Sequence, residues 1–154
     1  LSYSMDTENK TFNISNYSMS IDNLGELSVN TQIHNVDSIQ QMFQLAMNRT
    51  QGIKLGASSI KFKDDSITNT LLAMDAKKSG KDLTEYKENI LNKIQIDLDN
   101  NPQGVEKEFL VSAMEFIKDP SSFEVSIDPE NPMTLRDISR SSDLDKLHLD
   151  ISVN

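Results

Sequence analysis

A chain of 154 residues with an apolar fraction of 36% is the size of one domain and can bury a real core, which argues against disorder over its whole length. Its net charge of −9 repels nucleic acid and anionic lipid headgroups at long range, so nucleic acid is not expected as a partner. Because the chain has no cysteine, disulfides, thiolate metal sites and a cysteine nucleophile are all excluded.

The N-terminal part of the chain alternates between polar and apolar residues, as strands do. Phe12 and Ile14 are out of phase with Tyr17 and the apolar residues after it. One extra residue near Asn16 must therefore shift the register, which predicts a β-bulge or a bend. The Asp-Asn-Leu-Gly sequence that follows has turn chemistry, so residues 10–34 are predicted to form a hairpin.

Helical periodicity, capping residues and terminating glycines predict four helices. They run from Asp37 to Gly52, from Asp64 or Asp65 to Gly80, over about 83–98, and from Pro102 to Asp119. Between the first two helices, residues 53–63 are expected to be extended, with an irregularity at Gly56.

The last third of the chain returns to strand patterns. Residues 123–127 and 147–153 alternate, and residues 134–138 favour one helical turn. The sequence therefore predicts an α+β fold in which residues 1–154 form a single domain. Its antiparallel, curved sheet is formed by residues 10–34, 53–63, 123–127 and 147–153 and packs against about four helices.

The chain starts at Leu1 without an initiating methionine or a signal segment, and no apolar run approaches the roughly 18 residues that span a bilayer. We expect it to be a soluble piece of a longer exported protein with no transmembrane segment of its own. A terminal strand also implies a partner strand, within this domain or in a following unit.

Residues 97–108 join two predicted helices and place oxygen ligands at the first, third, fifth and twelfth positions of a twelve-residue segment. The four candidates are Asp97, Asp99, Asn101 and Glu108. This spacing resembles a calcium-binding loop. However, the sixth position, where such loops need glycine for a sharp turn, holds a proline, which favours a plain helix–turn–helix connection.

Methionines on the predicted helical faces suggest an adaptable apolar groove for a lipid or a peptide. The candidate residues are Met42, Phe43, Met74 and Met114. The competing interpretation is that these side chains only fill the core.

The sequence lacks several motifs of hydrolases, nucleotide-binding proteins and zinc proteins. It has neither a Gly-x-Ser-x-Gly elbow nor a glycine-rich phosphate loop, and its only histidines, His34 and His148, are not spaced as a zinc pair. Helix capping explains the neighbouring Asp64 and Asp65 better than acid–base catalysis does. We therefore predict no catalytic residues, no cofactor and no enzymatic activity.

Five segments carry a likeness to a known group of proteins, namely residues 22–29, 55–65, 76–80, 116–120 and 127–132. Together they resemble uncharacterised exported proteins of the proteobacterial cell envelope, which have strand-rich units and a helical insertion. The resemblance implies a periplasmic or otherwise exported location and a non-enzymatic role, and it brings no family catalytic residues.

The leading hypothesis is a binding or scaffold module that engages a lipid, a peptide or a neighbouring domain of the cell envelope through an apolar groove or a strand edge. One alternative is a surface interaction protein whose acidic face binds a basic partner. Another is an enzyme that uses carboxylates with a divalent cation, which would need several carboxylates to converge in one concave site.

Overall fold

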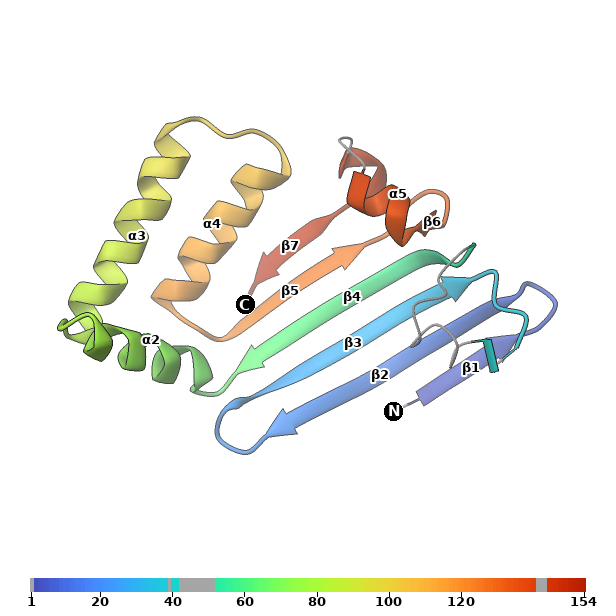
Figure 1. Cartoon of the computed structure of the whole chain (residues 1–154), viewed down its shortest axis with the longest axis horizontal. Coiled ribbons are helices and arrows are strands. Elements are labelled where there is room, and N and C mark those ends of the chain that lie inside the picture. The colour runs from blue at the N-terminus through green and yellow to red at the C-terminus, as the bar shows by residue number, and fades with distance from the viewer. Residues whose placement is uncertain (1, 39, 42–51, 141–143) are drawn as a thin grey trace. The chain divides into compact units, whose positions relative to one another are not determined.

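The computed structural model describes residues 2–38, 40–41, 52–140 and 144–154. Within these residues, seven strands form one sheet in the order β1-β2-β3-β4-β5-β7, and β6 pairs with β4. The strands are β1 (Ser2–Asp6), β2 (Thr11–Ile21), β3 (Gly25–His34), β4 (Lys54–Asp64), β5 (Ser122–Ile127), β6 (Met133–Thr134) and β7 (Asp150–Val153). Neighbouring arrows point in opposite directions (Figure 1), so the predicted antiparallel α+β fold is confirmed.

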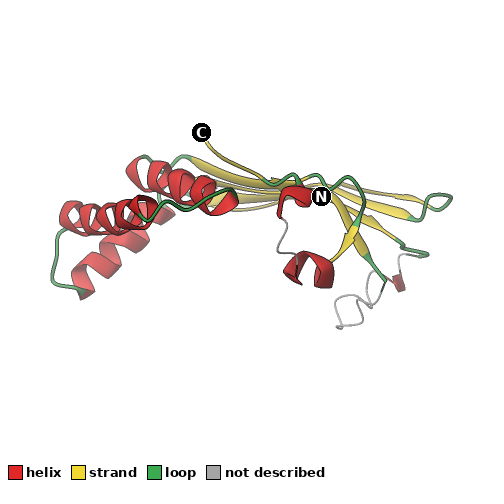
Figure 2. Cartoon of the chain, turned by 90° about the horizontal axis from the view of Figure 1, so that it is seen from above, coloured by secondary structure: helices red, strands yellow, loops and turns green. Residues whose placement is uncertain are grey.

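Four helices and one short 3-10 turn complete the described part of the chain (Figure 2). They are α2 (Ile67–Lys78), α3 (Leu83–Asp99), α4 (Val105–Lys118), α5 (Leu135–Arg140) and the turn at Leu144–Leu147. The N-cap of α2 is Ser66 and not Asp64 or Asp65 as predicted, although Asp64 Oδ1 accepts the Thr68 N–H of the first helical turn at 3.1 Å. Asp82 is the N-cap of α3 and accepts the Glu85 N–H at 2.9 Å.

The predicted bulge in β2 is also confirmed. Asn16 has a positive φ of 55° inside an otherwise continuous strand, a conformation that asparagine tolerates better than most residues. Its N–H is bonded to Asn30 Oδ1 at 2.9 Å. The predicted turn follows, with Asn23 at φ 62° and a Leu24 N–H to Ile21 O hydrogen bond of 3.0 Å.

Two predicted boundaries are corrected, and one strand is added. α4 begins at Val105 and not at Pro102, because Asn101 and Gly104 both have positive φ and keep the connection out of the helix. The last strand begins at Asp150 and not at residue 147, since Leu147 ends a 3-10 turn and His148 has a φ of 43°. In addition, β1 pairs with β2 from Ser2 opposite Ser15 to Asp6 opposite Thr11, a strand that the sequence did not reveal.

The chain divides into two compact units, and the long strands contribute residues to both. The first unit comprises Leu1–Ser18, Ser28–Ile60 and Val125–Asp150. The second comprises Met19–Leu27, Lys61–Glu124 and Ile151–Asn154.

The first unit has a small apolar core at the ends of its strands. Its buried members are Phe12, Ile33, Val36 and Ile53, with Met5, Ile14 and Leu55 packed against them. The Tyr3 ring stacks on Phe12 with 5.9 Å between centroids. β1 thereby adds to the core through Tyr3 and Met5, which lie on one side of that strand.

Aromatic rings pack α4 against β4 and β5 in the second unit. Phe116 of α4 lies edge-on to Phe62 of β4 at 6.2 Å and to Phe123 of β5 at 5.9 Å between centroids. Phe109 lies about two turns earlier on α4, and its ring is edge-on to that of Phe123 with 6.4 Å between centroids. Edge-on ring pairs add specificity to the burial of apolar area, so α4 is fixed to its strands by this cluster.

Candidate ligand groove in the first unit

An apolar groove of about 280 Å³ lies on β3, β4 and β5 within the first unit. Its apolar lining is Val29, Leu55, Ile60, Val125 and Ile127, and its polar lining is Asn30, Thr31, Ser58 and Ser59. None of these nine side chains carries a charge, so the groove offers an uncharged and mainly apolar surface.

An irregularity in β4 explains why residues at odd spacing share this surface. A Cβ at Gly56 would lie within 3 Å of the Gln32 and His34 side chains, whereas Ser58 Oγ lies 2.7 Å from Thr31 Oγ1. Residues 56 and 58 would point the same way in a regular strand, yet they meet opposite sides of β3. The irregularity predicted at Gly56 is thus present, and it brings Leu55 and Ile60 to the same side.

The polar lining of the groove is internally hydrogen-bonded. Ser58 Oγ donates to the Gly56 carbonyl at 3.1 Å, which leaves the Thr31 hydroxyl as the donor in their 2.7 Å contact. Asn30 Nδ2 donates to Ser59 Oγ at 3.4 Å. Because neighbouring residues of a strand point to opposite faces, the Thr31–Ser58 pair and the Asn30–Ser59 pair lie on opposite faces of the sheet.

The groove is open to solvent along one side. Ile60 is 54% exposed, whereas Ile33, also on a strand of this unit, is 8% exposed. An isoleucine left half in water forgoes much of the roughly 2 kcal/mol that its burial would contribute. Ile60 therefore adds little to the stability of the unit and is available to a partner.

A second hollow of about 280 Å³ adjoins the groove in the same unit. It shares Asn30, Ser58, Ser59 and Ile127 with the groove and adds Ala57, Ser126 and Asp128. Ser126 alternates with Val125 and Ile127 along β5, so it points to the opposite face of the sheet from the apolar lining of the groove.

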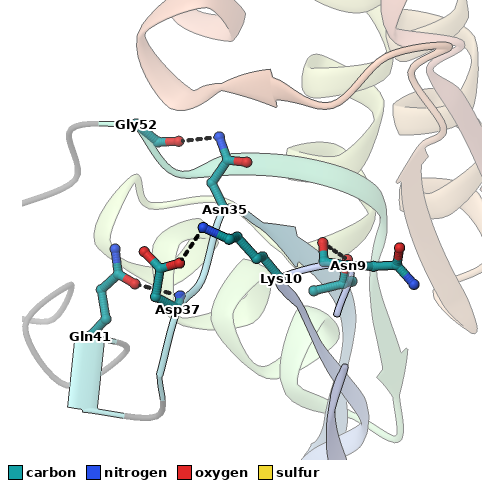
Figure 3. A network of polar contacts seen from close by, with 7 residues as sticks. Asn9, Lys10, Asn35, Asp37, Gln41 and Gly52 are labelled. Carbon is teal, nitrogen blue, oxygen red and sulfur yellow. Dashed lines mark hydrogen bonds and ion pairs between the residues drawn. The ribbon is translucent and has the colours of Figure 1, made fainter. Parts of the chain in front are cut away.

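A network of polar contacts holds the segment after β3 against the start of β2 (Figure 3). Lys10 Nζ lies 2.6 Å from Asp37 Oδ1, and the Asp37 N–H donates to Gln41 Oε1 at 2.7 Å. Asn35 Nδ2 donates to the Gly52 carbonyl at 2.9 Å. The network surrounds buried Val36, whose N–H donates to the Lys10 carbonyl at 2.9 Å, and we assign it a structural role.

The calcium candidates are spread over the α3–α4 connection. Asp97 and Asp99 lie in the last turns of α3, and Asp99 Oδ1 accepts Gln95 Nε2 at 2.8 Å. Asn101 Oδ1 accepts Gln103 Nε2 at 3.1 Å, and Glu108 lies in the first turn of α4. In the part of the chain that the structure describes, no three acidic or histidine side chains come together as metal ligands.

The methionine candidates lie outside the groove or outside the described residues. Met74 is 53% exposed on α2, Met114 is half-buried on α4, and neither lines the groove. Met42 and Phe43 are outside the described residues. The observed groove is built by strands, and alternation of Val29, Val125 and Ile127 was the available signal for it.

Among the described residues, three side chains have a shifted pKa, and each shift has a local cause. A backbone hydrogen bond from Asn9 is the main reason that the pKa of Asp6 is lowered. The Thr134 hydroxyl lowers the pKa of Asp137 by donating to it, and the hydrogen bond to Asp75 raises the pKa of Lys78. None of the three lines the groove.

The same described residues contain no helix that combines the length and apolarity needed to cross a membrane. No curated protein and no solved structure matches the chain. One family model does match, over residues 18–154, and its description reads "Uncharacterized protein". Because this match covers most of the chain, the protein belongs to that family of uncharacterised proteins.

Proposed function

We propose that this protein is a non-enzymatic binding module that holds an apolar ligand in the groove on β3, β4 and β5. The observation that carries the proposal is the groove itself, an uncharged concave surface with half-exposed Ile60 on its wall. Soluble domains seldom leave apolar side chains gathered in a hollow unless something binds there.

We further propose that the ligand comes from the cell envelope, as a lipid or as part of a protein. Support comes from the five segments, such as residues 55–65 and 127–132, that resemble exported proteobacterial envelope proteins. The excess of acidic over basic residues is consistent with this assignment, because it disfavours nucleic acid as a ligand.

The first test is a titration with Nile red, an uncharged apolar dye whose fluorescence rises in apolar surroundings. We expect one saturable site in the native chain. Ile60→Glu should lower the affinity for the dye by about tenfold, because the new carboxylate would have to be desolvated at the groove wall. Since Ile60 is half exposed, this variant should fold normally, which circular dichroism would check.

Ile21→Glu is a matched control. Ile21 is also a strand isoleucine and is 55% exposed, but it does not line the groove. Its substitution should leave dye binding unchanged. Equal weakening by both substitutions, or a native chain that does not saturate, would refute groove binding. Native mass spectrometry of the chain purified from its host would then show whether a lipid or a peptide copurifies.

A further inference from the structure

We propose that the chain forms a two-fold symmetric dimer in which β1 pairs antiparallel with β1 of a second copy. This inference goes beyond the proposed function and does not depend on it, because it concerns an edge of the sheet and not the groove. β1 is the outermost strand of the first unit and lies beside β2 (Figure 1). On its other side, the described part of the chain has no strand.

The outer side of β1 offers backbone groups for pairing. Successive residues of a strand direct their N–H and C=O groups to alternate sides, so roughly two or three residues of Ser2–Asp6 face outward. An antiparallel partner would then form about four to six hydrogen bonds with β1. Edge strands are usually protected from such pairing by lysine, proline or a bulge. The sequence Ser-Tyr-Ser-Met-Asp of β1 has neither lysine nor proline, and none of its residues has a positive φ.

Asp6, the charged residue of β1, is directed into the turn that follows the strand. Its carboxylate accepts the N–H groups of Glu8 and Asn9 at 3.0 Å each, and it accepts Asn9 Nδ2 at 2.7 Å. The charge is thereby held at the end of the strand, so it does not protect the rest of the edge against a neighbouring strand.

The sequence of β1 is complementary to itself in one antiparallel register. If the two-fold axis passes beside Ser4, this serine faces Ser4 of the second copy, and Tyr3 faces Met5 of the second copy. At the ends Ser2 faces Asp6, so no two like charges lie opposite each other. A shift by one residue would place Tyr3 opposite a serine. Because each residue finds a matching partner in this register, a second copy fits the edge better than an unrelated peptide does.

The dimer would also continue the core of the first unit. The Tyr3 ring stacks on Phe12 at 5.9 Å between centroids but is 61% exposed, and Met5 packs against the same core. In the proposed register, Met5 of the second copy covers Tyr3, which removes apolar area from water and places a thioether against the ring. The strand at the other edge, β7, differs from β1 because its Ile151 and Val153 are already half-buried.

The size of the contact sets the expected affinity. A standard protein interface buries about 800 Å² on each partner, and two strands of five residues fall short of this. We therefore expect a dissociation constant on the order of 10⁻⁴ M. Sedimentation equilibrium of the chain between ~5 and ~500 µM would measure it. The mean mass should rise from that of one chain toward that of two, and the mass of one chain at every concentration would overturn the proposal.

Two matched substitutions test the register. Ser2 and Ser4 are both exposed on the same face of β1. Ser4→Lys places two lysines opposite each other and should raise the dissociation constant at least about tenfold. Ser2→Lys places each lysine opposite Asp6 of the second copy and should lower it about threefold. Circular dichroism would check the fold, and Ser4→Glu repeats the like-charge test if Ser4→Lys fails to fold.

Equal effects of the two lysines would overturn the proposed pairing, and a dimer that both leave unchanged would place the interface elsewhere. Ile60→Glu should dimerise as the native chain does, because Ile60 lines the groove and is not part of β1. Dye binding and dimerisation therefore fail separately: loss of the dimer with saturable dye binding refutes the pairing of β1 alone, and the reverse result refutes the proposed function alone.

Discussion

The two units of the chain treat the apolar sides of their strands differently. In the second unit, Phe116 of α4 contacts both Phe62 and Phe123, so a helix of the chain covers the strand residues. In the first unit, four buried residues form a core at the strand ends, while Val125 and Ile127 line an open groove. Alternating apolar residues along a strand thus show which side is apolar, but not what covers it.

This contrast separates stability from binding. Residues that a helix of the chain covers stabilise the fold, and their loss should lower the free energy of unfolding. Ile60 on the groove wall is already half in water, so its loss should affect binding far more than folding. Each of the following predictions compares a change in one unit with a change in the other or within the same unit.

The largest effect is expected for Gly25→Ala in the second unit. A Cβ there would lie 2.6 Å from the Lys63 carbonyl oxygen, and the φ of 157° is strained for alanine. Because a backbone atom cannot move aside cheaply, we expect a loss of about 4 kcal/mol in the free energy of unfolding. Urea denaturation monitored by circular dichroism would measure it.

Gly56→Ala in the first unit is the comparison. Its Cβ would also come close to neighbours, at 2.7 Å from His34 Nε2 and 2.8 Å from Gln32 Oε1. These atoms are the far ends of side chains, which can rotate away, so the loss should be about 1 kcal/mol. Equal losses in the two glycine variants would show that the two sites are equally rigid and would contradict the expected difference in stability.

Phe116→Ala should be the next most damaging change, at about 3 kcal/mol, because it removes two edge-on ring contacts at once. Phe109→Ala is its control on the same helix. Phe109 is 50% exposed and contacts only one ring among the described pairs, so about 1 kcal/mol is expected. Thermal unfolding of the two variants would rank them, and the reverse order would contradict the assignment of Phe116 as the anchor of α4.

In the first unit, Val36→Ala should cost about 2 kcal/mol, since Val36 is fully buried in the core. Ile60→Ala removes more atoms, but from the groove wall. It should lower the free energy of unfolding by at most about 0.5 kcal/mol, and it should lower the affinity for the dye. The two variants would be compared by denaturant unfolding and by Nile red titration. A loss of stability in Ile60→Ala as large as in Val36→Ala would make the groove part of the core.

The sequence allowed prediction of those features that depend on local chemistry. Asn16 could be identified as the bulge because an extra residue had to reconcile Phe12 with Tyr17, and asparagine accepts the positive φ. The start of α2 could be placed close to Asp64, because this residue precedes an apolar helical face and its carboxylate can accept a backbone N–H, although the N-cap itself is Ser66.

The features that could not be predicted depend on distant partners. β1 contains only Tyr3 and Met5 as apolar residues, and it forms a strand because β2 and Phe12 are beside it. Leu147 continued the alternation of the last strand, yet it is buried at the end of a 3-10 turn. The groove was missed for the same reason, since a strand pattern contains no information on whether a helix lies over it.

The smallest expected effect concerns pH and again distinguishes the units. In the first unit, Asp6 accepts the Asn9 and Glu8 N–H groups at 3.0 Å and Asn9 Nδ2 at 2.7 Å, and the Asn9 backbone contact is the main cause of its lowered pKa. A lowered pKa in the folded chain means that the turn is stabilised above pH 3.8, the ordinary pKa, and that this contribution is lost as the pH falls through the folded value.

The pKa shift of Lys78 in the second unit has the opposite sign. The hydrogen bond to Asp75 raises its pKa above 10.5, so its contribution is present below that pH and is lost as the pH rises through the folded value. Acidification should therefore loosen the β1–β2 turn, whereas raising the pH should release the contact between Lys78 and Asp75. Nuclear magnetic resonance titration of the Asp6 carboxyl group, with amide exchange at Glu8 and Asn9, would measure this. Asp6→Asn should abolish the acid dependence of that exchange, and titration of Asp6 at or above pH 3.8 would contradict the role given to these hydrogen bonds.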